Sequence, residues 1–115
     1  WQAAQGVSDT ALCRAVAEME AGLVDADLGG GLFKKRVPRP GGGKRGGFRT
    51  LLSAKVGSRY VFLLGFAKSD RATITPDEKK ALQMAGQVFL GLAPCDLFKA
   101  VRAGVLTEVR CEQDH

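Results

Sequence analysis

The sequence predicts an α+β fold in which an N-terminal helix packs on an antiparallel sheet. Apolar residues recur at intervals of three and four in two segments, residues 12–23 and 82–92, which is the spacing of a helix face. Between them lie three stretches of strand length, separated by a glycine-rich loop and a tight turn. The predicted order is helix, three-strand antiparallel meander, second helix and small C-terminal element.

Length and composition predict one domain over residues 1–115. A chain of 115 residues can bury a core, and 45 % hydrophobic with 25 % charged residues is ordinary globular composition. No apolar run approaches the roughly 18 residues of a membrane span, and no secretory signal opens the sequence. We therefore expect a cytoplasmic protein with no membrane partner. Because the chain opens on Trp1 and not on methionine, we expect it to be part of a longer protein.

Cysteine and histidine usage argues against a metal site. The cysteines Cys13, Cys95 and Cys111 have wide spacing without a ligand motif, and His115 is the only histidine. This pattern predicts reduced thiols that act as small hydrophobic residues, not a disulfide framework. We expect no metal and no cofactor.

Two helices have clear start signals. Ser8 followed by Asp9 begins the first, and its apolar stripe is Leu12, Val16, Met19 and Leu23. The second begins at a capping box, Thr75 to Glu78, with proline at the first helical position, and we expect it to end near Pro94. A short helical piece over residues 96–103 and a stub strand over residues 105–109 complete the predicted order.

The strands differ in how far they are buried. From Leu32 the pattern has a period of two, so that Lys34 and Arg36 point to one side and Lys35 to the other. Prolines and glycines over residues 38–47 predict a mobile basic loop. Residues 48–55 resume as a strand, and residues 59–67 are apolar at both parities, which predicts a central strand covered on both faces.

Positive charge is concentrated in residues 29–49. This segment holds seven of the seventeen lysines and arginines and no acid, while the remainder, ten basic against twelve acidic, nets to −2. A local basic surface predicts a polyanionic partner, most commonly a phosphate backbone. The seven residues are Lys34, Lys35, Arg36, Arg39, Lys44, Arg45 and Arg49.

Two glycine motifs in this segment do not predict nucleotide binding. Gly41, Gly43 and Gly46 match G-x-G-x-x-G, but they lie between two strands, with no helix N-terminus to receive a pyrophosphate. The pair Gly43 and Lys44 lacks the serine or threonine of a P-loop.

The strand pattern predicts a phosphate site. Lys34 and Arg36 share one face, and Arg49 can face them from the adjoining strand if the register allows. A lysine crowded by cations loses its proton more readily, so Lys34 is the candidate general base, and arginines can stabilise charge on a scissile phosphate. Such a site would cleave RNA through its own 2′-hydroxyl. The alternative is a solvated loop, which for Lys35, Arg39 and Lys44 accounts for their charge equally well.

The run GLFKKRVPRPGGGKRGGFR, with the later FAKSDRATI, resembles the RelE/ParE superfamily of bacterial toxins, closest to its RelE/HigB-like branch. The resemblance covers roughly residues 8–92. It implies a compact fold with helices on a twisted antiparallel sheet, and an endoribonuclease that cuts messenger RNA in the ribosomal A site. The family usually begins with a strand, which we expect to be missing or truncated here.

The resemblance places catalytic roles on basic residues of two strands. By motif they fall on Lys34, Arg36 and Arg49. A further basic position falls on Lys68, assisted by Arg71, because Ser69 stands where RelE has an arginine, and Thr75 replaces its stacking tyrosine. The predicted RNA contacts are Lys35, Arg39, Lys44, Arg45 and Arg71.

The predicted function is therefore the toxin of a type II toxin–antitoxin system, a metal-independent and ribosome-dependent mRNA endonuclease. Two alternatives remain: a ParE-like poison of DNA gyrase, and a non-catalytic RNA-binding or ribosome-binding domain. The toxin prediction implies a cognate antitoxin, which we expect to be a helix-turn-helix protein, together with the ribosome and messenger RNA as partners.

Overall fold

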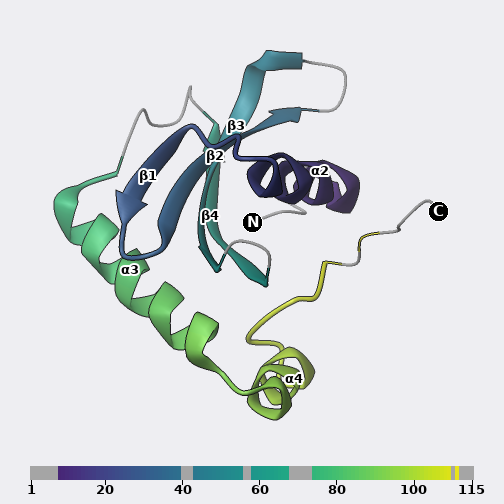
Figure 1. Cartoon of the computed structure of the whole chain (residues 1–115), viewed down its shortest axis with the longest axis vertical. Coiled ribbons are helices and arrows are strands. Elements are labelled where there is room, and N and C mark those ends of the chain that lie inside the picture. Colours follow the sequence, from purple (N-terminus) through teal and green to yellow (C-terminus); the bar gives the residue numbers. More distant parts are fainter. Residues whose placement is uncertain (1–7, 40–42, 56–57, 68–73, 110, 112–115) are drawn as a thin grey trace.

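The computed structural model describes residues 8–39, 43–55, 58–67, 74–109 and 111, with only the backbone described at positions 38, 39 and 43–47. Over these residues a four-stranded antiparallel sheet in the order β1-β2-β3-β4 packs with three helices (Figure 1). The predicted α+β fold is confirmed. The strands are β1 (Ala26–Gly29), β2 (Leu32–Arg39), β3 (Gly43–Lys55) and β4 (Arg59–Ala67).

The first strand was not predicted. β1 is a four-residue strand at the edge of the sheet, and it pairs with β2 from Ala26 opposite Lys34. This segment is too short and too polar to show a strand pattern in the sequence. Three glycines with positive φ, Gly29, Gly30 and Gly31, then turn the chain into β2.

The predicted basic loop is shorter than expected. β2 extends to Arg39 and β3 begins at Gly43, with Arg39 opposite Gly43 after a register shift that follows Val37. The sequence rule that prolines and glycines end strands is wrong here, because proline is tolerated at irregularities of a ladder and glycine can still form backbone hydrogen bonds.

Helix α2 (Asp9–Glu20) covers one face of the sheet, and Ser8 caps it by accepting the Ala11 N–H at 3.1 Å. Its buried residues are Leu12, Ala15 and Met19. They pack on side chains that β2, β3 and β4 direct to this face of the sheet, namely Val37, Phe48, Leu52, Ala54 and Ala67. The predicted stripe extended to Leu23, but the helix ends before it and Leu23 is 59 % exposed.

Helix α3 (Pro76–Gly91) covers the other face. The capping box predicted from Thr75 and Glu78 is confirmed, with both reciprocal hydrogen bonds formed. The core on this side is formed by strand residues that point to the opposite face of the sheet. Leu32, Leu51 and Phe66 are buried there, and Leu82 packs against them. The sheet therefore lies between α2 and α3, as expected for a strand β4 that is apolar at both parities.

Two side chains of α3 hold the hairpin turn between β1 and β2. The Gln83 amide donates to the carbonyls of Leu28 at 3.1 Å and Gly29 at 3.0 Å, and the Gln87 amide donates to the Gly30 carbonyl. The edge strand β1 is thus secured to α3 as well as to β2.

The C-terminal part differs most from the prediction. Helix α4 (Pro94–Arg102) forms, but none of its residues is buried, and residues 105–109 are not a strand. Instead, Cys13 of α2 and Cys111 form a disulfide with a Cα–Cα distance of 5.6 Å, across 98 residues of sequence. The expectation of three reduced thiols is wrong for this pair, because the fold returns the C-terminal segment to α2; Cys95 is free and exposed.

An open hollow of about 760 Å³ lies between this C-terminal segment, α2 and β4. It is lined by apolar side chains that include Val16, Phe62, Leu97 and Val101.

Among the described residues no single helix is long and apolar enough to cross a membrane. Helices α3 and α4 have the required length and apolarity only when they are taken together, and they are bent by 115° relative to each other.

Candidate nucleic-acid interface

Lys34, Arg36 and Arg49, here called the basic triad, lie on the α3 side of the sheet. Arg36 of β2 is directly opposite Arg49 of β3, and Lys34 is two residues before Arg36. The predicted juxtaposition is therefore confirmed by the strand register. The Arg36 side chain is exposed, while Lys34 and Arg49 are partly buried.

The two arginines face each other in the closer of the two antiparallel pair types. The Ala54 N–H donates to the Gly31 carbonyl at 2.9 Å, so the odd-numbered residues of β2 exchange hydrogen bonds with β3. Arg36 and Arg49 are therefore a non-hydrogen-bonded pair, for which the Cα atoms are about 4.5 Å apart. Like charges on residues directly opposite each other in paired strands are destabilising, and an anion bound between them would relieve the repulsion.

One donor of the basic triad has no partner. The Nε atom of Arg49 is buried, yet it makes no hydrogen bond to any residue that the structure describes. An unpaired buried donor costs roughly 1–3 kcal/mol, more when the group is charged. A phosphate oxygen bound here would supply the missing acceptor.

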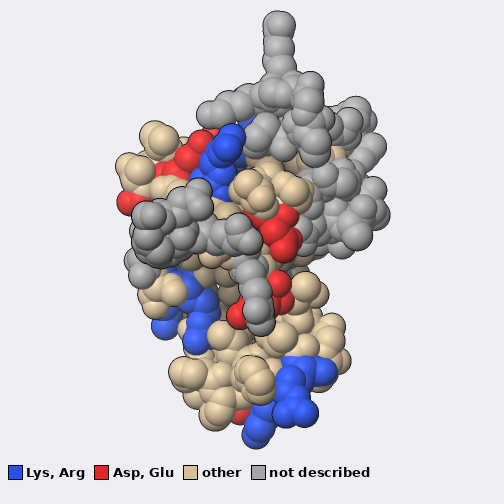
Figure 2. Space-filling view, turned by 90° about the vertical axis from the view of Figure 1, so that its right-hand side faces the viewer, with Lys and Arg blue, Asp and Glu red and all other residues tan. Residues whose placement is uncertain are grey.

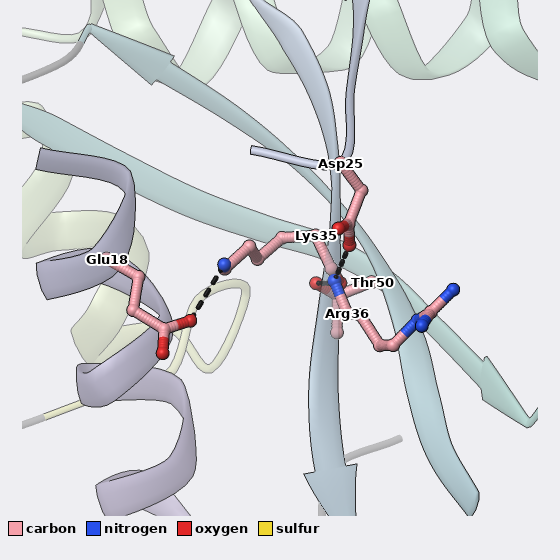
Figure 3. Close-up of polar contacts among 5 residues, drawn as sticks. All are labelled: Glu18, Asp25, Lys35, Arg36 and Thr50. Atoms are coloured by element: carbon pink, nitrogen blue, oxygen red, sulfur yellow. Dashed lines mark hydrogen bonds and ion pairs between the residues drawn. The ribbon is translucent and has the colours of Figure 1, made fainter. Parts of the chain in front are cut away.

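Lys35 does not belong to this surface, as Figure 3 shows. Its side chain is 6 % exposed and points to α2, where Nζ lies 2.7 Å from Oε1 of Glu18. Thr50 Oγ1 donates to the Lys35 carbonyl at 2.7 Å. The interpretation of Lys35 as an RNA contact is therefore corrected: odd positions of β2 face the core under α2, and this lysine is buried as one half of an ion pair.

The structure does not describe the side chains of the other predicted RNA contacts. Lys68 and Arg71 lie outside the described residues. Arg39, Lys44 and Arg45 lie on the paired ends of β2 and β3, where only the backbone is described. Their roles stay predictions.

Asp25 was missed by sequence analysis. Its carboxylate accepts the Arg36 N–H (Figure 3). Its own N–H donates to the Lys34 carbonyl at 3.1 Å. An acidic residue next to two of the triad residues could be found only from the pairing of β1 with β2, which the sequence did not indicate.

Charge on the side of the molecule seen in Figure 2 is mixed. Groups of lysine and arginine side chains alternate there with aspartates and glutamates, and the described residues form no continuous basic surface in this view. Among the described residues, no group of three or more histidine, cysteine or acidic side chains is placed to hold a metal ion.

These features define a class of protein, an α+β domain whose antiparallel sheet presents opposed cations suited to bind phosphate. The sequence matches the family model described as RelE toxin of the RelE / RelB toxin-antitoxin system over residues 1–109, so the chain belongs to the RelE toxin family. The predicted recognition of a RelE/ParE-type toxin is confirmed. Neither a curated protein nor a solved structure shows a significant match to the chain.

Proposed function

We propose that this toxin is an endoribonuclease that cleaves messenger RNA on the ribosome without a metal ion. The observation that carries the proposal is the opposition of Arg36 and Arg49 beside Lys34, with the Arg49 Nε donor buried and unpartnered among the described residues. Opposed cations on paired strands are pre-organised for the charge that develops on a phosphate during cleavage.

The chemistry would use the substrate's own hydroxyl. The 2′-oxygen attacks phosphorus and forms a new P–O bond, while the bond from phosphorus to the 5′-oxygen breaks. Lys34 acts as general base or phosphate anchor, taking the 2′-hydroxyl proton when its amine is neutral. Arg36 and Arg49 bind the non-bridging oxygens, and the departing 5′-oxygen takes up a proton with assistance from the predicted residues Lys68 and Arg71.

The partners follow from the same proposal. A toxin of this family is paired with an antitoxin, and we propose a helix-turn-helix protein whose contacting segment is acidic or carries an apolar helix, because it has to cover or distort a basic surface. The ribosome would supply the messenger RNA in the conformation that is cut. Membership in the HigB-like branch and a cytoplasmic location are part of the proposal.

Primer extension on messenger RNA tests the activity. Cells are pulsed with the wild-type protein, with Lys34→Ala or Arg49→Ala, or with Lys55→Ala, which removes an exposed lysine at the far end of β3. We expect cuts inside translated frames for the wild type and for Lys55→Ala, and none for the two triad variants or after initiation is blocked.

Other outcomes redirect the assignment. Intact messages with arrested growth and altered DNA supercoiling would replace the nuclease with a gyrase poison. Intact messages with the protein bound to ribosomes would indicate a non-catalytic RNA-binding domain. Cuts that persist in folded Arg49→Ala would remove this residue from the mechanism.

A further inference from the structure

The main chain of Lys34 and Arg36 points away from β3. Since the odd positions of β2 pair with β3, the N–H and carbonyl groups of these two even positions are directed to the edge of the sheet where β1 lies. β1, however, begins only at Ala26, opposite Lys34. The backbone of Arg36 therefore lies beyond the last paired residue of the edge strand.

Asp25 continues the pairing past this point. Its N–H donates to the Lys34 carbonyl at 3.1 Å. Its carboxylate accepts the Arg36 N–H in place of a strand carbonyl (Figure 3). One residue thus holds the outer edge of both basic positions of β2. No described side chain forms an ion pair with this carboxylate, so its contact with the site is through the backbone.

This part of β2 needs such a restraint. Arg36 faces the like charge of Arg49, and the strand ends three residues later at Arg39. Pro38 has no N–H to give to a ladder, and the register with β3 shifts after Val37. Repulsion between the arginines favours a shift of this strand end, and the hydrogen bond from Arg36 to Asp25 restrains β2 against slipping along β1.

We propose that Asp25 is a positioning residue of the toxin: by accepting the Arg36 N–H it holds β2 in the register that keeps Arg36 opposite Arg49. This inference rests on the proposed nuclease function for its consequence in catalysis. Its structural half, that the Asp25 carboxylate holds the Arg36 backbone, stands independently. Asp25 itself contacts no reacting atom.

Three variants separate the hydrogen bond from the charge. Asp25→Asn keeps an acceptor oxygen of the same reach and removes the charge, whereas Asp25→Ala removes both. Asp27→Ala is the matched control, since Asp27 is also an aspartate of this edge whose carboxylate accepts a backbone N–H, that of Gly29 at 2.9 Å, away from Lys34 and Arg36.

The first readout is hydrogen exchange of the Arg36 amide, followed by NMR in the full chain, and it needs no enzymatic activity. We expect slow exchange in the wild type, Asp25→Asn and Asp27→Ala, and exchange accelerated by about tenfold or more in Asp25→Ala, since the amide then lacks a protein acceptor. Fast exchange of this amide in the wild type, or no change in a folded Asp25→Ala, would overturn the proposal.

The second readout is multiple-turnover cleavage of messenger RNA in purified ribosome complexes, with kcat and KM separated. Displacement of a positioned group can cost about 100-fold in rate, so we expect kcat to fall between about 10- and 100-fold in Asp25→Ala and by less than about threefold in Asp25→Asn, with KM nearly constant. An equal loss in Asp25→Asn would show that the charge acts, and would overturn the positioning role.

Failure of the nuclease assignment is recognised separately. If the wild type cleaves no RNA while the exchange pattern of the four proteins is as expected, the proposed function is wrong and the hold of Asp25 on Arg36 stands. If the wild type cleaves RNA and Asp25→Ala exchanges and cleaves like the wild type, the nuclease stands and the positioning role is refuted.

Discussion

Replacement of Gly86 by alanine should destabilise the protein, although alanine favours helices. Gly86 of α3 lies against Ser53 of β3, and an added Cβ would be 1.7 Å from Ser53 Oγ and 2.6 Å from Ser53 Cβ. Rotation of the serine moves only its Oγ, so the second clash remains. Because Ser53 is fully buried in the middle of the sheet, relief requires α3 to move outward.

The magnitude follows from two opposed effects. Overpacking of a core costs about 1–3 kcal/mol, whereas glycine to alanine inside a helix gains about 1 kcal/mol. We therefore expect a net loss of up to about 2 kcal/mol, equivalent to a Tm lowered by up to about 8 °C for a chain of this size. Gly91 is the control, since an added Cβ there meets no atom within 4 Å, and Gly91→Ala should be neutral or stabilising.

Urea denaturation and calorimetry of Gly86→Ala, Gly91→Ala and a Gly86→Ala/Ser53→Gly double variant measure these terms. The double variant removes both clashing atoms, so the two substitutions should be strongly non-additive, with a favourable coupling of about 1 kcal/mol or more. A Gly86→Ala protein as stable as Gly91→Ala would refute the close packing of α3 on β3.

Three further changes test other parts of the fold. Cys13→Ser, or a reductant, should lower the calorimetric Tm strongly, because closing a loop of about 100 residues stabilises by up to about 4.7 kcal/mol in a chain-entropy model. Cys95→Ser is the control and should leave the Tm unchanged. An unchanged Tm for Cys13→Ser would argue against the disulfide. Arg59→Met should lower the free energy of unfolding in urea by about 1.5–3 kcal/mol, since the Arg59 guanidinium donates to backbone carbonyls at the end of α3 at 2.7 and 2.8 Å. A loss below about 0.5 kcal/mol, typical of surface substitutions, would contradict this role. Lys35→Ala should cost about 1.5–3 kcal/mol in urea denaturation, because it removes a buried side chain together with its ion pair to Glu18 of α2. A variant as stable as the wild type but weaker in RNA binding would return Lys35 to the RNA-binding surface.

Most of the correct prediction of the site came from the alternation of side chains between the two faces of a strand. The alternation from Leu32 placed Lys34 and Arg36 on one face, and the segment after residue 47 brought Arg49 to the same face once the strands paired. The same alternation also placed Lys35 on the opposite face, where it is buried. Its assignment as an RNA contact followed from charge alone and neglected that parity.

Features that depend on contacts between distant segments could not be predicted. β1 has no apolar pattern and exists because β2 and two glutamines of α3 hold it. The Cys13–Cys111 disulfide depends on how the chain returns after α4. Asp25 can hold Arg36 because the pairing of β1 with β2 starts only at Ala26, one residue after it. No local sequence signal shows where that pairing starts.

The proposed function depends on cleavage of RNA by the opposed cations of the basic triad. The most direct test is cleavage of messenger RNA in purified ribosome complexes by Arg49→Ala beside Lys55→Ala, both shown to be folded by calorimetry. Loss of an oxyanion-stabilising group commonly costs about 100- to 1,000-fold in rate, so we expect that loss for Arg49→Ala and near wild-type cleavage for Lys55→Ala. Equal cleavage by the two variants would show that the Arg49 side chain takes no part in cleavage.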